Sequence, residues 1–202
     1  MQANDVLNPR LILIGSSTGG PSCLRVLFAH LKLHETDRLI IVQHMPLKMT
    51  ERFAGRIEEA LGRTVRVAQT GDTLEQYTTL VAPGDRHLSF ALSSQAAPYC
   101  RISKRNHHQI FRPSIDLAIS TAAGLDSFRK FAVILTGMGN DGSAALAEFK
   151  RKSGICLAQD PKEAASPGMP SAALATGCID ACLNVKDIAG FLNRHIITSA
   201  AA

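Results

Sequence analysis

The chain has 202 residues, 46% of them hydrophobic and 19% charged, values typical of a soluble globular domain that exclude a disordered tail, a collagen-like fibre and a coiled coil. Its 22 Lys and Arg exceed its 17 Asp and Glu by only five charges, and with no Trp and two Tyr it has few rings for stacking on bases. We therefore expect no nucleic-acid partner.

The first part of the chain predicts two strand–helix units. A continuous apolar run at Leu11–Ile14 is followed by Pro21, which opens a helix with apolar residues at i, i+3, i+4 and i+7. A second run, Leu39–Val42, precedes a helix that Thr50 is predicted to cap and that ends near Gly62. Strands that are apolar at every position are typical of a parallel sheet covered on both faces.

The middle of the chain lacks the alternation of apolar strands and helices seen in the first part. Short β-rich segments alternate there with turn residues, a pattern that predicts hairpins. The segments are Thr64–Ala68, Tyr77–Ala82, His87–Leu92 and Tyr99–Ser103.

The last part returns to alternating helices and strands. Pro113 is predicted at the first position of a helix that runs to Gly124. The further elements are a strand at Phe131–Leu135, a helix with Leu146 and Phe149, a strand at Ile155–Ala158, a short helix from Pro170, an apolar run at Cys178–Leu183, and a helix from Val185 to about Ile197. We predict one α/β domain over residues 10–197, a doubly wound, mostly parallel sheet with helices on both faces and a small β-hairpin insertion. Residues 1–9 and 198–202 are expected to be frayed tails.

The five cysteines include no CxxC pair, so neither a disulfide framework nor a zinc site is predicted. The adjacent His107 and His108 lack a third ligand at a suitable spacing, and we expect no metal site. No apolar run approaches the length of a membrane span, and the N-terminus lacks the apolar block of a signal peptide. These features predict a cytoplasmic protein without membrane insertion.

The first strand is followed by the sequence GSSTGGP, in which Ser17 occupies the centre of a G-x-S-x-G motif between a strand and a helix. This is the context of a nucleophile elbow, which presents a serine hydroxyl above a sheet. The same glycine-rich turn is also compatible with a phosphate-binding loop or an ordinary tight turn.

Two further strand ends carry polar residues. His44 follows the second strand in QHMP, and Asp141 follows a later strand in TGMGNDG, where it is also predicted to cap the next helix. Carboxyl ends of parallel strands meet at one edge of a sheet, where ligands bind. A serine hydroxyl needs a base to attack a carbonyl, and the base needs an anion to orient it. Ser17, His44 and Asp141 therefore form a candidate catalytic triad.

The segments IGSSTGGP, VQHMP, VAPGDRH, FRPSIDLA, LTGMGNDG, LAQD and PGMPSAALATG occur in this order. Over roughly residues 10–195, the chain resembles the catalytic domain of the bacterial chemotaxis protein-glutamate methylesterase family. The resemblance implies a Ser17, His44, Asp141 triad, Thr18 as a neighbour that helps hold the imidazole, and Met138 as an oxyanion contact. It implies no cofactor.

The resemblance also implies a reaction and its partners. Members hydrolyse γ-glutamyl methyl esters on the cytoplasmic helices of methyl-accepting chemotaxis receptors, release methanol, and can deamidate receptor glutamines. The best-known members carry a receiver domain that blocks the site, and we expect none in these 202 residues. The chain is then either a domain excised from a longer protein, with a receiver in cis, or a member without that switch, on which a separate receiver could act in trans. The chain departs from the family at Phe111, where a histidine is expected, and in the loop Asp160–Ser166.

Two alternatives belong to other function classes. One is a phosphate- or nucleotide-binding α/β module built on the GSSTGGP turn, although that turn lacks the lysine of a P-loop. The other is a scaffold that docks on receptors without hydrolysing anything.

Overall fold

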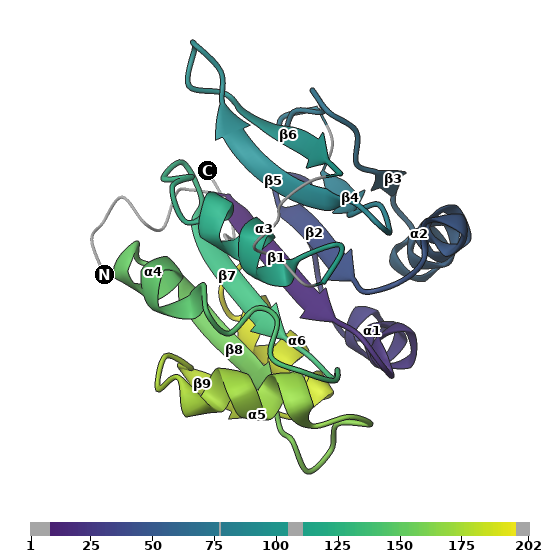
Figure 1. Ribbon diagram of the computed structural model, residues 1–202, viewed down its shortest axis with the longest axis vertical. Coiled ribbons are helices and arrows are strands. Elements are labelled where there is room, and N and C mark those ends of the chain that lie inside the picture. Colours follow the sequence, from purple (N-terminus) through teal and green to yellow (C-terminus); the bar gives the residue numbers. More distant parts are fainter. Residues whose placement is uncertain (1–8, 77, 105–110, 197–202) are drawn as a thin grey trace, which may run out of the picture.

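A computed structural model describes residues 9–76, 78–104 and 111–196. Its main feature is a seven-stranded sheet in the order β3-β4-β2-β1-β7-β8-β9, with every pairing parallel (Figure 1). These strands are β1 (Arg10–Ser16), β2 (Arg38–Gln43), β3 (Arg66–Val67), β4 (Thr79–Val81), β7 (Arg129–Ile134), β8 (Ile155–Gln159) and β9 (Ala181–Leu183). The predicted doubly wound parallel sheet is therefore confirmed.

Helices cover both faces of the sheet. They are α1 (Gly20–Phe28), α2 (Leu47–Leu61), α3 (Ile115–Ala122), α4 (Leu146–Arg151), α5 (Gly168–Ala175) and α6 (Val185–Asn193). Successive side chains of a strand point to opposite faces, so Ile12 and Ile14 pack with α1, α2 and α6, whereas Leu11 and Leu13 pack with α3, α4 and α5. None of the helices in the described ranges is long and apolar enough to cross a lipid bilayer.

The central strand β1 determines where a site can form. After β1, the chain forms β2, β3 and β4 on one side of it, then returns to form β7 on the other side. Such a reversal of strand order opens a crevice at the carboxyl ends of the strands. The turns after β1, β2 and β7 all lie at this edge.

The prediction of hairpins in the middle of the chain was correct for one pair of strands and wrong for the other. β5 (His87–Leu92) and β6 (Pro98–Ser103) form the predicted antiparallel hairpin, which packs on α3. β3 and β4 instead join the main sheet in parallel, and all of β4 is buried. Burial on both faces favours the parallel arrangement. Tyr77, the first residue of one predicted segment, lies outside the described residues.

Two helix starts differ from the prediction. Thr50 does not cap α2, which begins at Leu47, and its hydroxyl instead accepts a hydrogen bond from the Gly84 amide at 3.0 Å. Pro113 precedes α3, whose N-cap is Ser114 with its hydroxyl 3.2 Å from the Leu117 amide. In both cases a polar side chain accepts a hydrogen bond from a backbone amide. Sequence spacing alone locates the first residue of such a helix only approximately.

A buried ion pair fixes the opposite edge of the sheet. Arg10 and Asp37 have side chains 0% and 3% exposed, and Arg10 Nε donates to Asp37 Oδ1 at 2.9 Å. The same guanidinium donates to the carbonyls of Leu192 and Lys32, which ties β1 to α6 and to the segment after α1. The guanidinium is buried and all its described acceptors are the Asp37 carboxylate or backbone carbonyls, so the pair is costly to break.

Replacing Asp37 by Ala should lower the free energy of unfolding by about 3–5 kcal/mol, because the Arg10 charge would remain buried without its partner. Glu148→Ala, which removes the exposed pair with Arg151, should cost at most about 1 kcal/mol. Urea titrations of both variants measure these changes. Equal stabilities of the two variants would show that the buried pair does not have this role.

Candidate active site

Ser17 and His44 lie side by side just beyond two paired strands. The register pairs Ser16 with Gln43, so Ser17 and His44 are the next residues on adjacent strands, which lie about 4.8 Å apart. The ladder continues to this point, because the His44 amide donates to the Ser16 carbonyl at 3.0 Å. On the other side, the Ser17 amide donates to the Thr136 carbonyl at 2.9 Å.

His44 contacts Asp141 directly. Its Nε2 lies 2.8 Å from Asp141 Oδ2, and the two side chains are 12% and 2% exposed. The Phe111 ring stacks on the imidazole with centroids 5.0 Å apart and an interplanar angle of 7°. The carboxylate therefore restrains one edge of the imidazole, and the phenyl ring covers one face.

Asp141 does not open the helix that follows it, as the sequence predicted, because α4 begins only at Leu146. Its carboxylate instead lies at the N-terminus of α3, where it accepts hydrogen bonds from the amides of Ile115 at 2.7 Å and Asp116 at 3.0 Å. The Ser114 hydroxyl lies 3.2 Å from Oδ1. Asp141 thus places a negative charge at a helix N-terminus, as predicted. The helix is α3, which precedes Asp141 in the chain, and not the helix that follows it.

Competing effects set the charge of this carboxylate. Burial alone would raise the pKa of Asp141, but the hydrogen bonds from His44 and from the amides of Asp116 and Ile115 lower it below its ordinary value. The neighbouring Asp116 shifts the other way: burial raises its pKa and the Asp141 charge adds to the effect, against the Ala145 and Gly142 amides that lower it. Of the two carboxyl groups, Asp141 is therefore the one that loses its proton at the lower pH.

Gln43 is a positioning residue that the sequence analysis did not identify. Its Nε2 donates to the carbonyls of Ser17 at 2.9 Å and His44 at 3.0 Å, and its Oε1 accepts from the Ser16 hydroxyl at 2.6 Å. One amide thus holds the two turns together. A Cβ on Gly20 would lie 2.0 Å from Gln43 Oε1, so the glycine leaves room for this amide.

The turn around Ser17 differs from a strained nucleophile elbow. Ser17 lies between β1 and α1 as predicted, but the left-handed residue is Gly19, with φ of +81°. A Cβ on Gly137 would lie 2.8 Å from the Ser17 Cβ, so the loop after β7 approaches the serine closely. Ser17 is half-buried. Within the described residues, no hydrogen bond joins its hydroxyl to His44.

Thr18 and Met138, the two residues expected to support the triad, lie at the rim of the site. Thr18 is exposed, and its carbonyl accepts from the Thr136 hydroxyl at 2.9 Å. Among the described residues its own hydroxyl makes no hydrogen bond to His44. The Met138 side chain is 66% exposed. In the part of the chain that the structure describes, no group of three or more His, Cys, Asp or Glu is arranged to hold a metal ion.

Comparison with known proteins gives consistent matches. The family model described as CheB methylesterase matches residues 12–192. Proteins named protein-glutamate methylesterase/protein-glutamine glutaminase are 35% identical over 92% of this chain in Treponema pallidum and 34% identical over 93% in Pyrococcus horikoshii. The alignments cover 46% and 54% of those proteins, so the chain spans about half the length of these curated relatives.

A solved structure agrees with this match. The CheB methylesterase catalytic domain of Thermotoga maritima superimposes with a TM-score of 0.83 and 29% sequence identity, over 94% of this chain and 100% of that one. The parallel sheet, the turns at its carboxyl edge and the family-model match lead to one assignment. The chain belongs to the CheB methylesterase family.

Proposed function

We propose that this chain is a serine hydrolase that removes methyl groups from γ-glutamyl methyl esters of chemoreceptors and releases methanol. The observation that carries the proposal is the His44–Asp141 hydrogen bond of 2.8 Å beside a serine in the neighbouring strand register. Family membership supports an ester hydrolase over a nucleotide-binding module or a non-catalytic scaffold.

In the proposed mechanism, the Ser17 hydroxyl oxygen bonds to the ester carbonyl carbon while His44 accepts its proton. Since Nε2 is engaged by Asp141, Nδ1 is the nitrogen that receives this proton. The ionised Asp141 stabilises the resulting imidazolium, which then protonates the departing methoxide to methanol. Water repeats the cycle on the acyl-enzyme and frees the glutamate carboxylate. Attack on a glutamine amide would release ammonia by the same route.

Two rim residues complete the proposed site. We assign Thr18 to support of the imidazole and the loop at Met138 to the oxyanion, as the family resemblance implies. Each hydrogen-bond donor directed at a developing oxyanion raises the turnover rate by about 10²–10³-fold. No cofactor enters these steps.

The proposed substrates are the cytoplasmic helices of methyl-accepting chemotaxis receptors, so we place the protein in the cytoplasm. A receiver domain acting in cis or in trans is the proposed regulator. The names of the similar proteins support this setting, since they include both the methylesterase and the glutaminase activity.

Ser17→Ala should abolish methanol release from a methylated receptor fragment, because it removes the nucleophile. Asp141→Asn should reduce turnover by about 10⁴-fold, because the imidazole loses its orienting anion. Ser171→Ala, on the exposed side of α5, is the matched control and should retain full activity. Wild-type methanol release by Ser17→Ala would refute the assignment.

Phe111→Ala should lower kcat by about two- to tenfold, because the imidazole loses the ring that fixes its plane. This range corresponds to the interaction free energy of an aromatic pair. KM for a small ester should stay unchanged, and Phe111→Tyr should restore kcat. Steady-state kinetics on both variants separates the two parameters. An unchanged kcat in Phe111→Ala would show that the stacking has no part in orienting His44.

A further inference from the structure

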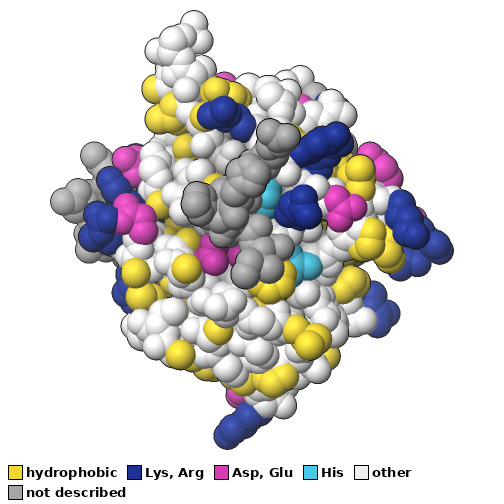
Figure 2. Space-filling view, in the orientation of Figure 1, with side chains coloured by type: hydrophobic (Ala, Val, Ile, Leu, Met, Phe, Trp, Pro, Cys, Tyr) yellow, Lys and Arg dark blue, Asp and Glu magenta, His cyan; other side chains and the backbone are white. Residues whose placement is uncertain are grey.

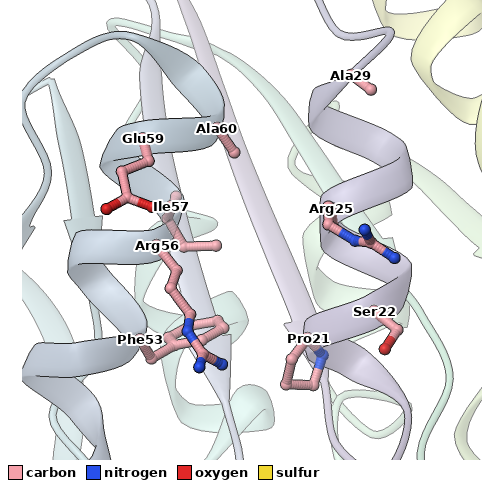
Figure 3. A pocket seen from close by; sticks show the side chains of 9 residues that line it. All are labelled: Pro21, Ser22, Arg25, Ala29, Phe53, Arg56, Ile57, Glu59 and Ala60. Atoms are coloured by element: carbon pink, nitrogen blue, oxygen red, sulfur yellow. The ribbon is translucent and has the colours of Figure 1, made fainter.

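A groove with a volume of about 620 Å³ lies between α1 and α2 (Figure 3). Its floor is formed by Phe53 and Ile57, which are continuous with the core beneath the two helices. Pro21, Ala29 and Ala60 form its small apolar walls. The small side chains on the facing sides of the two helices leave this space open.

Two arginines and one glutamate line the groove, which leaves its lining with an excess of one positive charge. Arg25 and Arg56 both line it and are exposed, and neither forms an ion pair with any described residue. Glu59, the acidic residue among the described lining residues, points away from α1 in Figure 3. Lys48 and Arg52 precede Arg56 along α2 at intervals of one turn, and the same helix also carries Glu51 and Glu58.

The surface around α2 also combines charged and hydrophobic side chains. Figure 2 shows Lys and Arg side chains beside hydrophobic and some acidic side chains at the right edge of the molecule, where α2 lies. A surface that combines apolar area with unpaired cations is complementary to a partner with apolar side chains flanked by carboxylates.

The groove begins next to the candidate active site. α1 starts three residues after Ser17, and α2 starts three residues after His44. Both helices run away from that edge of the sheet, so Pro21 and Phe53 mark the near end of the groove. The groove therefore lies between the two helices that begin at the candidate active site.

We propose that the α1–α2 groove binds an acidic amphipathic helix of the protein substrate, in the segment that flanks the esterified glutamate. From Pro21 to Ala29 the groove wall extends about 12 Å, or roughly two turns of a bound helix. Apolar side chains at i, i+3 or i+4, and i+7 of that helix would lie on Phe53 and Ile57, with its carboxylates next to Arg25 and Arg56. This inference rests on the proposed function, whose substrate is a protein ester.

The test uses the double charge reversal Arg25→Glu with Arg56→Glu. Methanol release from a methylated receptor fragment should show a roughly tenfold higher KM, with kcat retained and with less dependence on ionic strength than in the wild type. Hydrolysis of a small aryl acetate ester should be unchanged, which also shows that the variant folds. Lys152→Glu with Lys186→Glu is the control, since both lysines are exposed, lie outside the groove lining and change the charge equally.

A binding measurement separates this inference from the proposed function. A fluorescent helical peptide with leucines at i, i+3 and i+7 and flanking glutamates should bind the wild type and the control, but bind the groove variant at least tenfold more weakly. A peptide with lysines in place of the glutamates should not bind.

Several outcomes would overturn the proposal. These are unchanged peptide affinity or unchanged KM in the groove variant, or self-association of the wild type that the groove mutations abolish, which would assign the groove to a second copy of the chain. Peptide binding without any ester hydrolysis by the wild type would instead refute the proposed function and leave the groove assignment supported.

Discussion

The Asp141 carboxylate connects the parts of the molecule that must act together. It follows β7, holds the N-terminus of α3 through the Ile115 and Asp116 amides, and bonds to His44 at the end of β2. Burial of a carboxylate is costly unless hydrogen bonds compensate for the lost water. The same amides that stabilise α3 therefore keep Asp141 ionised, and the ionised carboxylate fixes the imidazole. Folding of α3 and orientation of the proposed base depend on one interaction.

The parallel sheet provides the second constraint. Register places Ser17 and His44 next to each other without any long-range side-chain contact, since each is the first residue beyond a paired strand. Gln43 then holds both turns through their carbonyls, and Gly20 leaves the space that this amide occupies. The proposed nucleophile and base are thus positioned by backbone geometry, while the carboxylate and Phe111 restrain the ring itself.

Sequence patterns predicted the features that depend on local periodicity. The apolar runs at Leu11–Ile14 and Leu39–Val42 predicted buried parallel strands, and strand ends predicted which turns meet. Features that depend on tertiary contacts were missed: Asp141 caps α3, not the helix that follows it, and Gln43 appeared only as the neighbour of a histidine. β4 joined the main sheet because it is covered on both faces, which three residues are too few to reveal. The catalytic roles themselves remain predictions.

The central claim is that the Ser17 hydroxyl is activated by the His44–Asp141 pair. The most direct measurement is reaction of the folded protein with a fluorophosphonate, followed by peptide mass spectrometry to locate the adduct. The account predicts a single adduct on Ser17 that is lost when His44 is replaced by Gln, because the serine then lacks its base. An adduct on another residue, or equal labelling of Ser17 without His44, would contradict it.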